Sequence, residues 1–221
     1  MVWIEKLGAG LQRVVGTPRR LAATLAVLTG LLAGVVWLSP AERTLGEGIK
    51  WVYVHVALTW TGMTGLAAAA LLGLALLITG RPGWEPWTRL TGWVGLGFFA
   101  AGWLMSAIAS QVNWGGVALN EPRNQVNLQV LAAGVIVVIT GSWLSRPRWH
   151  GVLYPLLFGW MLWAFAATPV ILHPRNPIFS SESPAFAAAF AASYAVSLLA
   201  AGALLAYLRR RAGLAGAADR R

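Results

Sequence analysis

The sequence predicts an all-α, polytopic membrane protein with six transmembrane helices. Of its 221 residues, 57% are hydrophobic and only 11% are charged, and the mean hydropathy is +0.64. A soluble domain carries about 25% charged residues, so this chain has too little polar surface to cover itself in water. Six long runs without Asp, Glu, Lys or Arg complete the pattern.

Each of these runs contains 18 residues or more, enough to cross the hydrocarbon core of a bilayer as a helix. Helix is the expected structure because lipid cannot satisfy the hydrogen bonds of an open strand edge. We treat the chain as a single integral-membrane domain, 1–221. The predicted spans are 21–38, 51–79, 90–110, 126–144, 151–172 and 185–208.

The spans differ in how they begin and end. No convincing small-residue cleavage site follows the first, so we expect it to be retained, and "LSPAER" ends it. The second is the longest and is expected to tilt or protrude. The segments "RPGWEPWTR" and "SRPRWH" predict tight basic turns before the third and fifth spans. After the sixth, 209–221 is predicted to be a basic cytoplasmic tail, of which the last segment, "RAGLAGAADRR", is expected to be frayed.

The distribution of charge predicts the orientation. With the N-terminus in the cytoplasm, the inner segments contain 13 of the 17 Lys and Arg residues and three acids, whereas the outer segments contain four of each sign. The positive-inside rule therefore places both termini in the cytoplasm. The outer loops are then 39–50, 111–125 and 174–184.

This distribution also narrows the classes of partner. Basic residues gathered at one membrane face set topology and contact anionic lipid. We therefore expect the basic residues behind the net charge of +10 to contact the bilayer and not nucleic acid. The chain has no cysteine, which excludes disulfides, iron–sulfur clusters and cysteine-ligated zinc.

The three histidines carry the most specific signal. The predicted topology places His55 and His173 at the same depth near the outer face, one on the second span and one at the end of the fifth. Imidazole ligates transition metals and haem iron, and an ionisable residue inside a span is a functional candidate. Each could instead be structural, His55 bonding a neighbouring carbonyl and His173 ending a helix before Pro174. Their matching depth favours a pair of ligands. His150, beside Trp149, is interpreted as an inner-surface residue.

The helix around His55 indicates where its side chain points. Trp51, His55 and Thr59 share one face at i, i+4 and i+8, and Gly62 and Gly65 follow near it. Small residues let helices approach closely in lipid. We therefore expect His55 to point into the bundle.

Two outer loops contain further candidates. Trp114 opens the second loop beside Gly115 and Gly116, an arrangement that could present an indole and bare backbone to a flat ligand. Arg175 in the third loop could pair with a carboxylate such as a propionate, or could be a solvent-exposed charge.

Three of these segments resemble the cytochrome c assembly, or haem-handling, family of the CcmC/CcsA group. "YVHVALTW" is similar to its tyrosine-x-His-valine segment, and "VILHP" to its second histidine. The family's outer loop reads Trp-Gly-x-Trp-Trp-x-Trp-Asp-x-Arg, and this chain reads "WGGVALNEPR" in the same register. Trp114, Gly115 and Arg123 match, and Glu121 replaces the aspartate. Three tryptophan positions are instead occupied by Val117, Ala118 and Asn120.

The resemblance implies a protein that holds haem b transiently at the outer face of a prokaryotic plasma (inner) membrane and delivers it for cytochrome c maturation. His55 and His173 would be the axial ligands. The expected surrounding residues are Trp51, Trp114, Gly115, Glu121, Arg123 and Arg175. Expected partners are a haem chaperone or apocytochrome c and an ABC-type ATPase complex, since the chain has no Walker motif.

Two other functions fit the same residues. One is a permease subunit that moves haem or a small solute with a partner ATPase. The other is a membrane cytochrome subunit with a fixed bis-histidine haem, which would often need a second haem near the inner side. Nothing in the sequence supplies a hydrolase-type nucleophile and base, so we do not expect an enzyme.

Overall fold

The computed structural model describes residues 14–144, 146–168 and 183–218, with only the backbone of 214–218. Its described part contains six helices long and apolar enough to cross a membrane, so the prediction of an all-α, six-span fold is confirmed. These helices are α2 (Pro18–Leu38), α3 (Ile49–Thr79), α4 (Glu85–Trp114), α5 (Pro122–Trp143), α6 (Arg148–Ala167) and α7 (Pro184–Ala218). A short 3₁₀ turn, η1 (Pro82–Trp84), joins α3 to α4.

Helix ends follow local chemistry more than hydropathy. Pro18 and Pro122 stand in the first turns of α2 and α5, where the missing N–H of proline costs nothing. Gly80 and Gly115 end α3 and α4 with φ of +64° and +73°, a left-handed conformation that glycine adopts without strain.

Two predicted boundaries are wrong. The fifth span was expected to run to 172, but α6 ends at Ala167, and Thr168 after it is extended. The sixth span was expected to end at 208 and "RAGLAGAADRR" to be frayed, but α7 continues as helix to Ala218. A helix can extend beyond the hydrocarbon because its charged side chains reach the membrane interface, and hydropathy detects only the apolar part.

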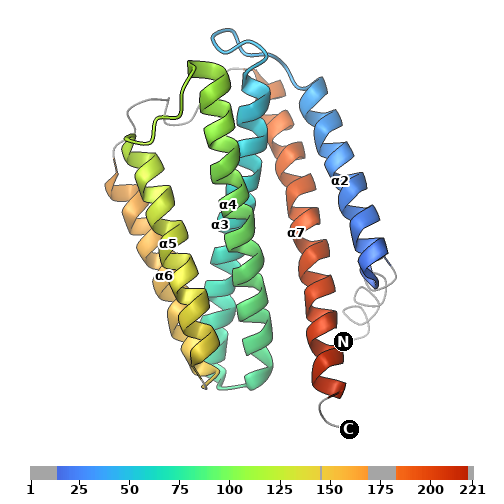
Figure 1. The fold of residues 1–221 in the computed structure, drawn as a ribbon, viewed down its shortest axis with the longest axis vertical. Helices are drawn as coiled ribbons and strands as arrows, with labels where there is room; N and C mark the ends of the chain where they lie inside the picture. Colours follow the sequence, from blue (N-terminus) through green and yellow to red (C-terminus); the bar gives the residue numbers. More distant parts are fainter. Residues whose placement is uncertain (1–13, 145, 169–182, 219–221) are drawn as a thin grey trace.

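The helices alternate in direction, which gives the bundle two distinct ends (Figure 1). We call the end with residues 39–48 and 115–121 the loop end. The opposite end, with the turn at 80–84, residues 146–147 and the last turns of α7, contains most of the described arginines, and we call it the basic end. This concentration of arginines at one end of the bundle agrees with the predicted topology. That the loop end faces the outer side stays a prediction.

Helices α3 and α4 meet along a seam of small residues. A Cβ atom added at Gly62 would lie 2.3 Å from the backbone nitrogen of Phe99, and one added at Gly65 would lie 2.6 Å from the Cα of Gly95. Side chains larger than glycine would push the helices apart, so these positions permit the close backbone contact by which membrane helices associate.

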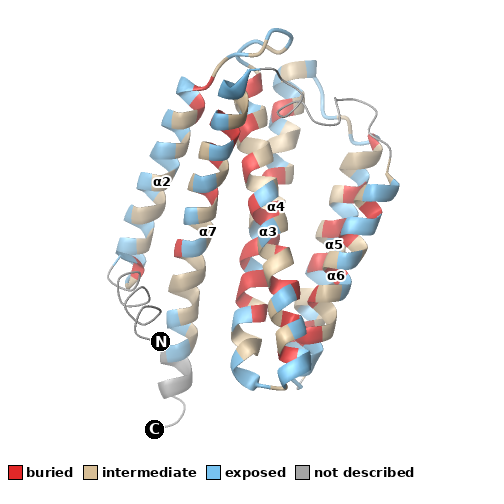
Figure 2. Cartoon of the chain, turned by 180° about the vertical axis from the view of Figure 1, so that it is seen from behind, coloured by how far each residue is buried: buried red, intermediate tan, exposed pale blue. Residues whose placement is uncertain are grey.

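Two hydrophobic clusters define the packing (Figure 2). The larger joins α3, α4, α5 and α6 and includes Phe99, Val130 and Met161. The smaller joins α2, α3 and α7 near the loop end, around Tyr53 and Phe190. Helix α2 is mostly exposed and lies beside α7, so its outer face is left for lipid (Figures 1 and 2).

Candidate functional site

His55 lies in the seam between α3 and α4, near the loop end. Its Nδ1 atom is 2.8 Å from the carbonyl oxygen of Gly102, and the Thr59 hydroxyl is 3.4 Å from the same nitrogen. Because a carbonyl can only accept, Nδ1 is the protonated nitrogen, and Nε2 is then the basic nitrogen of the neutral ring. His55 thus points into the bundle, as expected.

The sequence makes this approach possible through Gly102. A Cβ atom there would lie 2.4 Å from the Thr59 hydroxyl oxygen and 2.6 Å from the Thr59 backbone nitrogen. Without that atom, α3 comes close enough for the imidazole to reach a backbone carbonyl of α4. A histidine whose Nδ1–H donates to a carbonyl has its ring and tautomer fixed, which is the arrangement of most metal-ligating histidines.

His173 and Arg175 lie outside the described residues. The pairing of His173 with His55 and the contact of Arg175 with a carboxylate therefore stay predictions. In sequence, His173 follows the end of α6 by six residues.

Trp114 is the last residue of α4 and does not belong to a loop. The N–H of Gly115 closes the helix by donating to the Gln111 carbonyl at 3.0 Å. One residue earlier, the Asn113 amide donates to the Gly48 carbonyl at 3.1 Å, which ties the end of α4 to the start of α3. Trp114 is exposed at this junction and so presents its indole at the loop end.

Glu121 is buried, with 7% of its surface exposed, and caps α5. Its Oε2 atom accepts a hydrogen bond from the Asn124 N–H at 2.8 Å. The other oxygen, Oε1, has no hydrogen-bond partner among the described residues. Glu121 therefore sets where α5 begins and leaves one carboxylate oxygen inside the loop end.

Arg123 links α5 to the end of α6. Its Nη1 atom donates to the Phe165 carbonyl at 3.1 Å, and its guanidinium carbon lies 5.0 Å from the centre of the Phe165 ring. Trp51, in the first turn of α3, is partly exposed. The elements that contain the described candidates thus gather at the loop end, on three different helices.

The turn at 39–48 has its own charged anchor. The Glu42 carboxylate accepts hydrogen bonds from the N–H groups of Leu45 and Thr44, each at 2.8 Å. The bond from Leu45, followed by that from Thr44, lowers the pKa of Glu42 below its ordinary value. The carboxylate is therefore ionised, and the turn closed, through the neutral range and somewhat below the ordinary pKa of glutamate.

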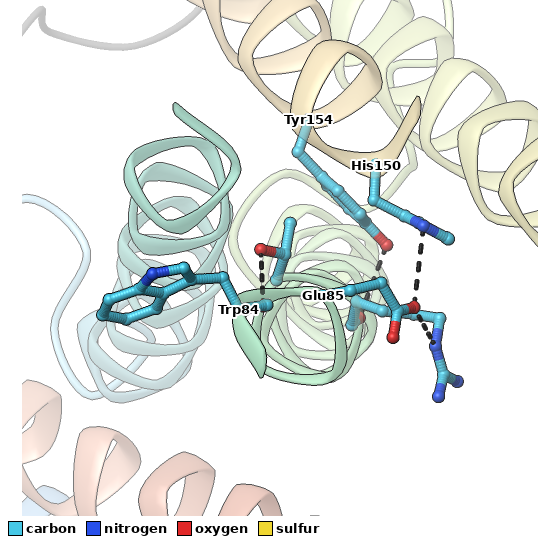
Figure 3. A network of polar contacts seen from close by, with 6 residues as sticks. Trp84, Glu85, His150 and Tyr154 are labelled. Carbon is cyan, nitrogen blue, oxygen red and sulfur yellow. Dashed lines mark hydrogen bonds and ion pairs between the residues drawn. The ribbon is translucent and has the colours of Figure 1, made fainter. Parts of the chain in front are cut away.

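A second polar group occupies the basic end (Figure 3). The Glu85 Oε1 atom lies 3.0 Å from the Arg89 Nε and 3.6 Å from the His150 Nδ1. The Tyr154 hydroxyl donates to the Arg89 carbonyl at 3.4 Å. We call Glu85, Arg89, His150 and Tyr154 the basic-end clasp, because it joins α4 to α6.

The interpretation of His150 as a surface residue is wrong. Only 6% of its surface is exposed, and a Cβ atom added at Gly141 of α5 would lie 2.8 Å from its Nε2. The ring is therefore enclosed by α4, α5 and α6. A sequence signal was present, since Glu85–Arg89 and His150–Tyr154 are both i, i+4 pairs just after the turns of successive hairpins.

The clasp is better suited to holding helices than to binding a metal. At 3.6 Å, the Glu85 Oε1 and the His150 Nδ1 lie close together but too far apart for a hydrogen bond. Within the described residues, no group of three or more His, Asp or Glu side chains could hold a metal ion.

No model of a known protein family matches this chain, and no curated protein matches it. The fold and the placement of these residues define a polytopic membrane protein with an oriented histidine near one end of its bundle.

Proposed function

We propose that this protein holds haem at the outer membrane face and delivers it for cytochrome c maturation. One observation carries the proposal, namely the imidazole of His55, whose Nδ1 is 2.8 Å from the Gly102 carbonyl. With Nδ1 protonated, Nε2 is the ring nitrogen that carries the lone pair, which is the form in which a neutral imidazole ligates a metal.

The depth of His55 also supports the proposal. Burial of a histidine within a membrane span is costly unless partners compensate for it, and the Gly102 carbonyl is one such partner. His55 lies about two helical turns from the start of α3, at a depth suited to a flat, largely apolar molecule entering from the loop end. His173 is the proposed second axial ligand.

Haem also carries two propionates, which need cationic partners at the water-facing edge. A guanidinium has five N–H donors, so Arg123 has donors beyond the one that bonds Phe165. Arg123 and Arg175 are the proposed propionate contacts. Trp114, exposed at the end of α4, is the proposed stacking surface, with Trp51 and Gly115 beside it.

Delivery would require partners. The proposed recipients are a haem chaperone or apocytochrome c on the periplasmic side of a prokaryotic plasma (inner) membrane. Any ATP-driven step would belong to a separate ABC-type subunit. The chain itself would exchange ligands on iron and leave covalent bonds unchanged.

Haem titration of the purified protein tests the proposal. We expect the detergent-solubilised protein to take up haem b and give the absorption spectrum of a bis-histidine complex. His55→Ala and His173→Ala should each lower the affinity at least ~10-fold, because loss of one protein ligand leaves the iron with a single strong bond. His150→Ala at the opposite end is the matched control and should bind normally. A wild-type protein that takes up no haem would refute the proposal.

A bis-histidine membrane cytochrome is a second candidate, favoured by the burial of His150 at the basic end. A fixed electron carrier would keep its haem through repeated dilution and redox cycles. Such a carrier would contain a second haem near the basic end, and the absorption of that haem would be lost in His150→Ala. The delivery proposal expects one haem per chain and its loss on dilution.

A further inference from the structure

An apolar groove of about 390 Å³ runs between α4 and α7, and Leu58 of α3 also contributes to its wall. Its walls include Trp93, Gly97, Phe98 and Ala101 of α4 and Leu204 and Leu208 of α7. All its lining residues are apolar, so the groove suits hydrocarbon rather than a polar solute.

Gly97 keeps the floor of this groove open. A Cβ atom added there would meet no atom within 4 Å. This contrasts with Gly62, Gly65 and Gly102, which lie against neighbouring backbone. Gly97 therefore has no role in close helix packing, and its missing side chain leaves room for a guest.

The groove ends at a cluster of arginines. Arg209, Arg210 and Arg211 follow Leu208 directly on α7. The guanidinium carbon of Arg209 lies 5.3 Å from the centre of the Trp87 ring, and Trp87 is six residues before Trp93 on α4. Positive charge therefore lies next to the apolar groove, at its basic end.

This charge is not neutralised within the described part of the chain. Glu85 is the acid at this end among those residues, and its carboxylate contacts Arg89 and His150. The Nε of Arg209 is buried and has no hydrogen-bond partner among the described residues. The cluster therefore has donors and charge for an external anion.

We propose that the groove binds an anionic phospholipid of the leaflet at the basic end. One acyl chain would lie over Gly97 between Trp93 and Leu204, and the headgroup phosphate would contact Arg209, Arg210 and Arg211. Basic pockets between helices at the cytoplasmic side recognise lipid headgroups in this way. Charge complementarity selects this occupant, since an apolar helix of another protein would leave the arginines unused.

Native mass spectrometry of the full chain in detergent tests the proposal, with dioleoyl phosphatidylglycerol and dioleoyl phosphatidylcholine as probes. We expect the anionic lipid to be retained at least ~10-fold more than the zwitterionic one, since each Arg near the headgroup contributes about fivefold. Arg209→Gln/Arg210→Gln/Arg211→Gln should remove this preference. The matched control removes the same number of charges at the same end and should keep the preference for the anionic lipid. It is Arg81→Gln/Arg146→Gln/Arg148→Gln.

A second variant tests the groove itself. Gly97→Leu should fill it without a clash and reduce retention of phosphatidylglycerol at least ~5-fold. Gly202→Leu is the control, because a Cβ atom there also meets no atom within 4 Å but Gly202 does not line the groove. This variant should leave retention of phosphatidylglycerol unchanged. If the triple arginine variant fails to fold, Arg210→Gln/Arg211→Gln alters only exposed side chains and should lower the preference in part.

Three results would overturn the proposal. The first is equal retention of the two lipids by the wild-type protein. The second is retention of phosphatidylglycerol that neither Gly97→Leu nor the arginine variants change. The third is a wild-type dimer that Gly97→Leu dissociates, because a second copy of the chain would then occupy the groove. None of these results bears on haem uptake, so the proposed function is tested separately.

Discussion

The imidazole of His55 depends on a neighbour that has no side chain. Gly102 offers a carbonyl at 2.8 Å and lets Thr59 of α3 pack against its Cα. The fixed orientation of the proposed iron ligand is therefore a property of the seam between α3 and α4 as much as of the histidine itself.

Gly102→Ala should weaken haem binding without touching either proposed ligand. The added Cβ would lie 2.4 Å from the Thr59 hydroxyl oxygen, so α3 and α4 must separate and the bond from His55 must lengthen. We expect a haem affinity ~10-fold lower and a loss of roughly 1–3 kcal/mol of stability. Haem titration and thermal unfolding measure these effects.

Gly97→Ala is the matched control, because the same change on the same helix meets open space. Equal effects at the two positions would contradict the role given to Gly102.

Glu121 is the other residue whose role the structure defines. Glu121→Ala removes the acceptor for the Asn124 N–H and should cost roughly 0.5–2 kcal/mol of local stability at the start of α5. Amide hydrogen exchange at 123–125 should become ~2- to 30-fold faster. Glu121→Asp should keep most of the protection, because aspartate also caps helices well. Unchanged exchange in Glu121→Ala would show that the cap contributes nothing.

Some of these residue-level features could be predicted from the sequence. The i, i+4 face of His55 with Gly62 and Gly65 beyond it correctly predicted a side chain that points into the bundle. The burial of His150 was not predicted. Its enclosure depends on Glu85 of one hairpin and Gly141 of another, and only tertiary packing brings these together.

Helices were predictable where hydrophobicity alone decides them. All six spans were predicted because a long uncharged apolar run has no other stable structure in lipid. Their ends were less predictable. Helix α7 continues through three arginines to Ala218, and α6 ends before Thr168, and neither limit coincides with the end of an apolar run.

The basic-end clasp should stabilise the packing of α4 against α6. Glu85→Ala removes the carboxylate shared by Arg89 and His150 and should cost roughly 1–3 kcal/mol, because the side chains of Glu85 and His150 are only 19% and 7% exposed. The thermal midpoint of unfolding in detergent measures this loss.

Glu47→Ala provides the comparison. Its ion pair with Lys50 is surface-exposed, so its removal should change stability by less than about 1 kcal/mol. A clasp variant as stable as Glu47→Ala would mean that the clasp contributes little to packing.

The molecule as a whole is polarised between its loop end and its basic end. Among the described residues, the loop end contains acids and bases in similar numbers, while the basic end is rich in arginine. This asymmetry predicts that the loop end faces away from the cytoplasm.

Cysteine labelling in intact cells tests this orientation on a clean background, because the chain has no cysteine. A membrane-impermeant thiol reagent applied from outside should label Asn120→Cys and leave Arg148→Cys unlabelled until the membrane is permeabilised. Labelling of Arg148→Cys alone would invert the topology and place the proposed haem site in the cytoplasm.

Transfer of haem from the loaded protein to excess apomyoglobin tests haem delivery most directly. Wild-type protein should bind haem and release it to the acceptor within minutes, and His55→Ala should fail to load, because its iron ligand is missing. A wild type that takes up no haem, or that keeps it indefinitely in the presence of apomyoglobin, would contradict a delivery function.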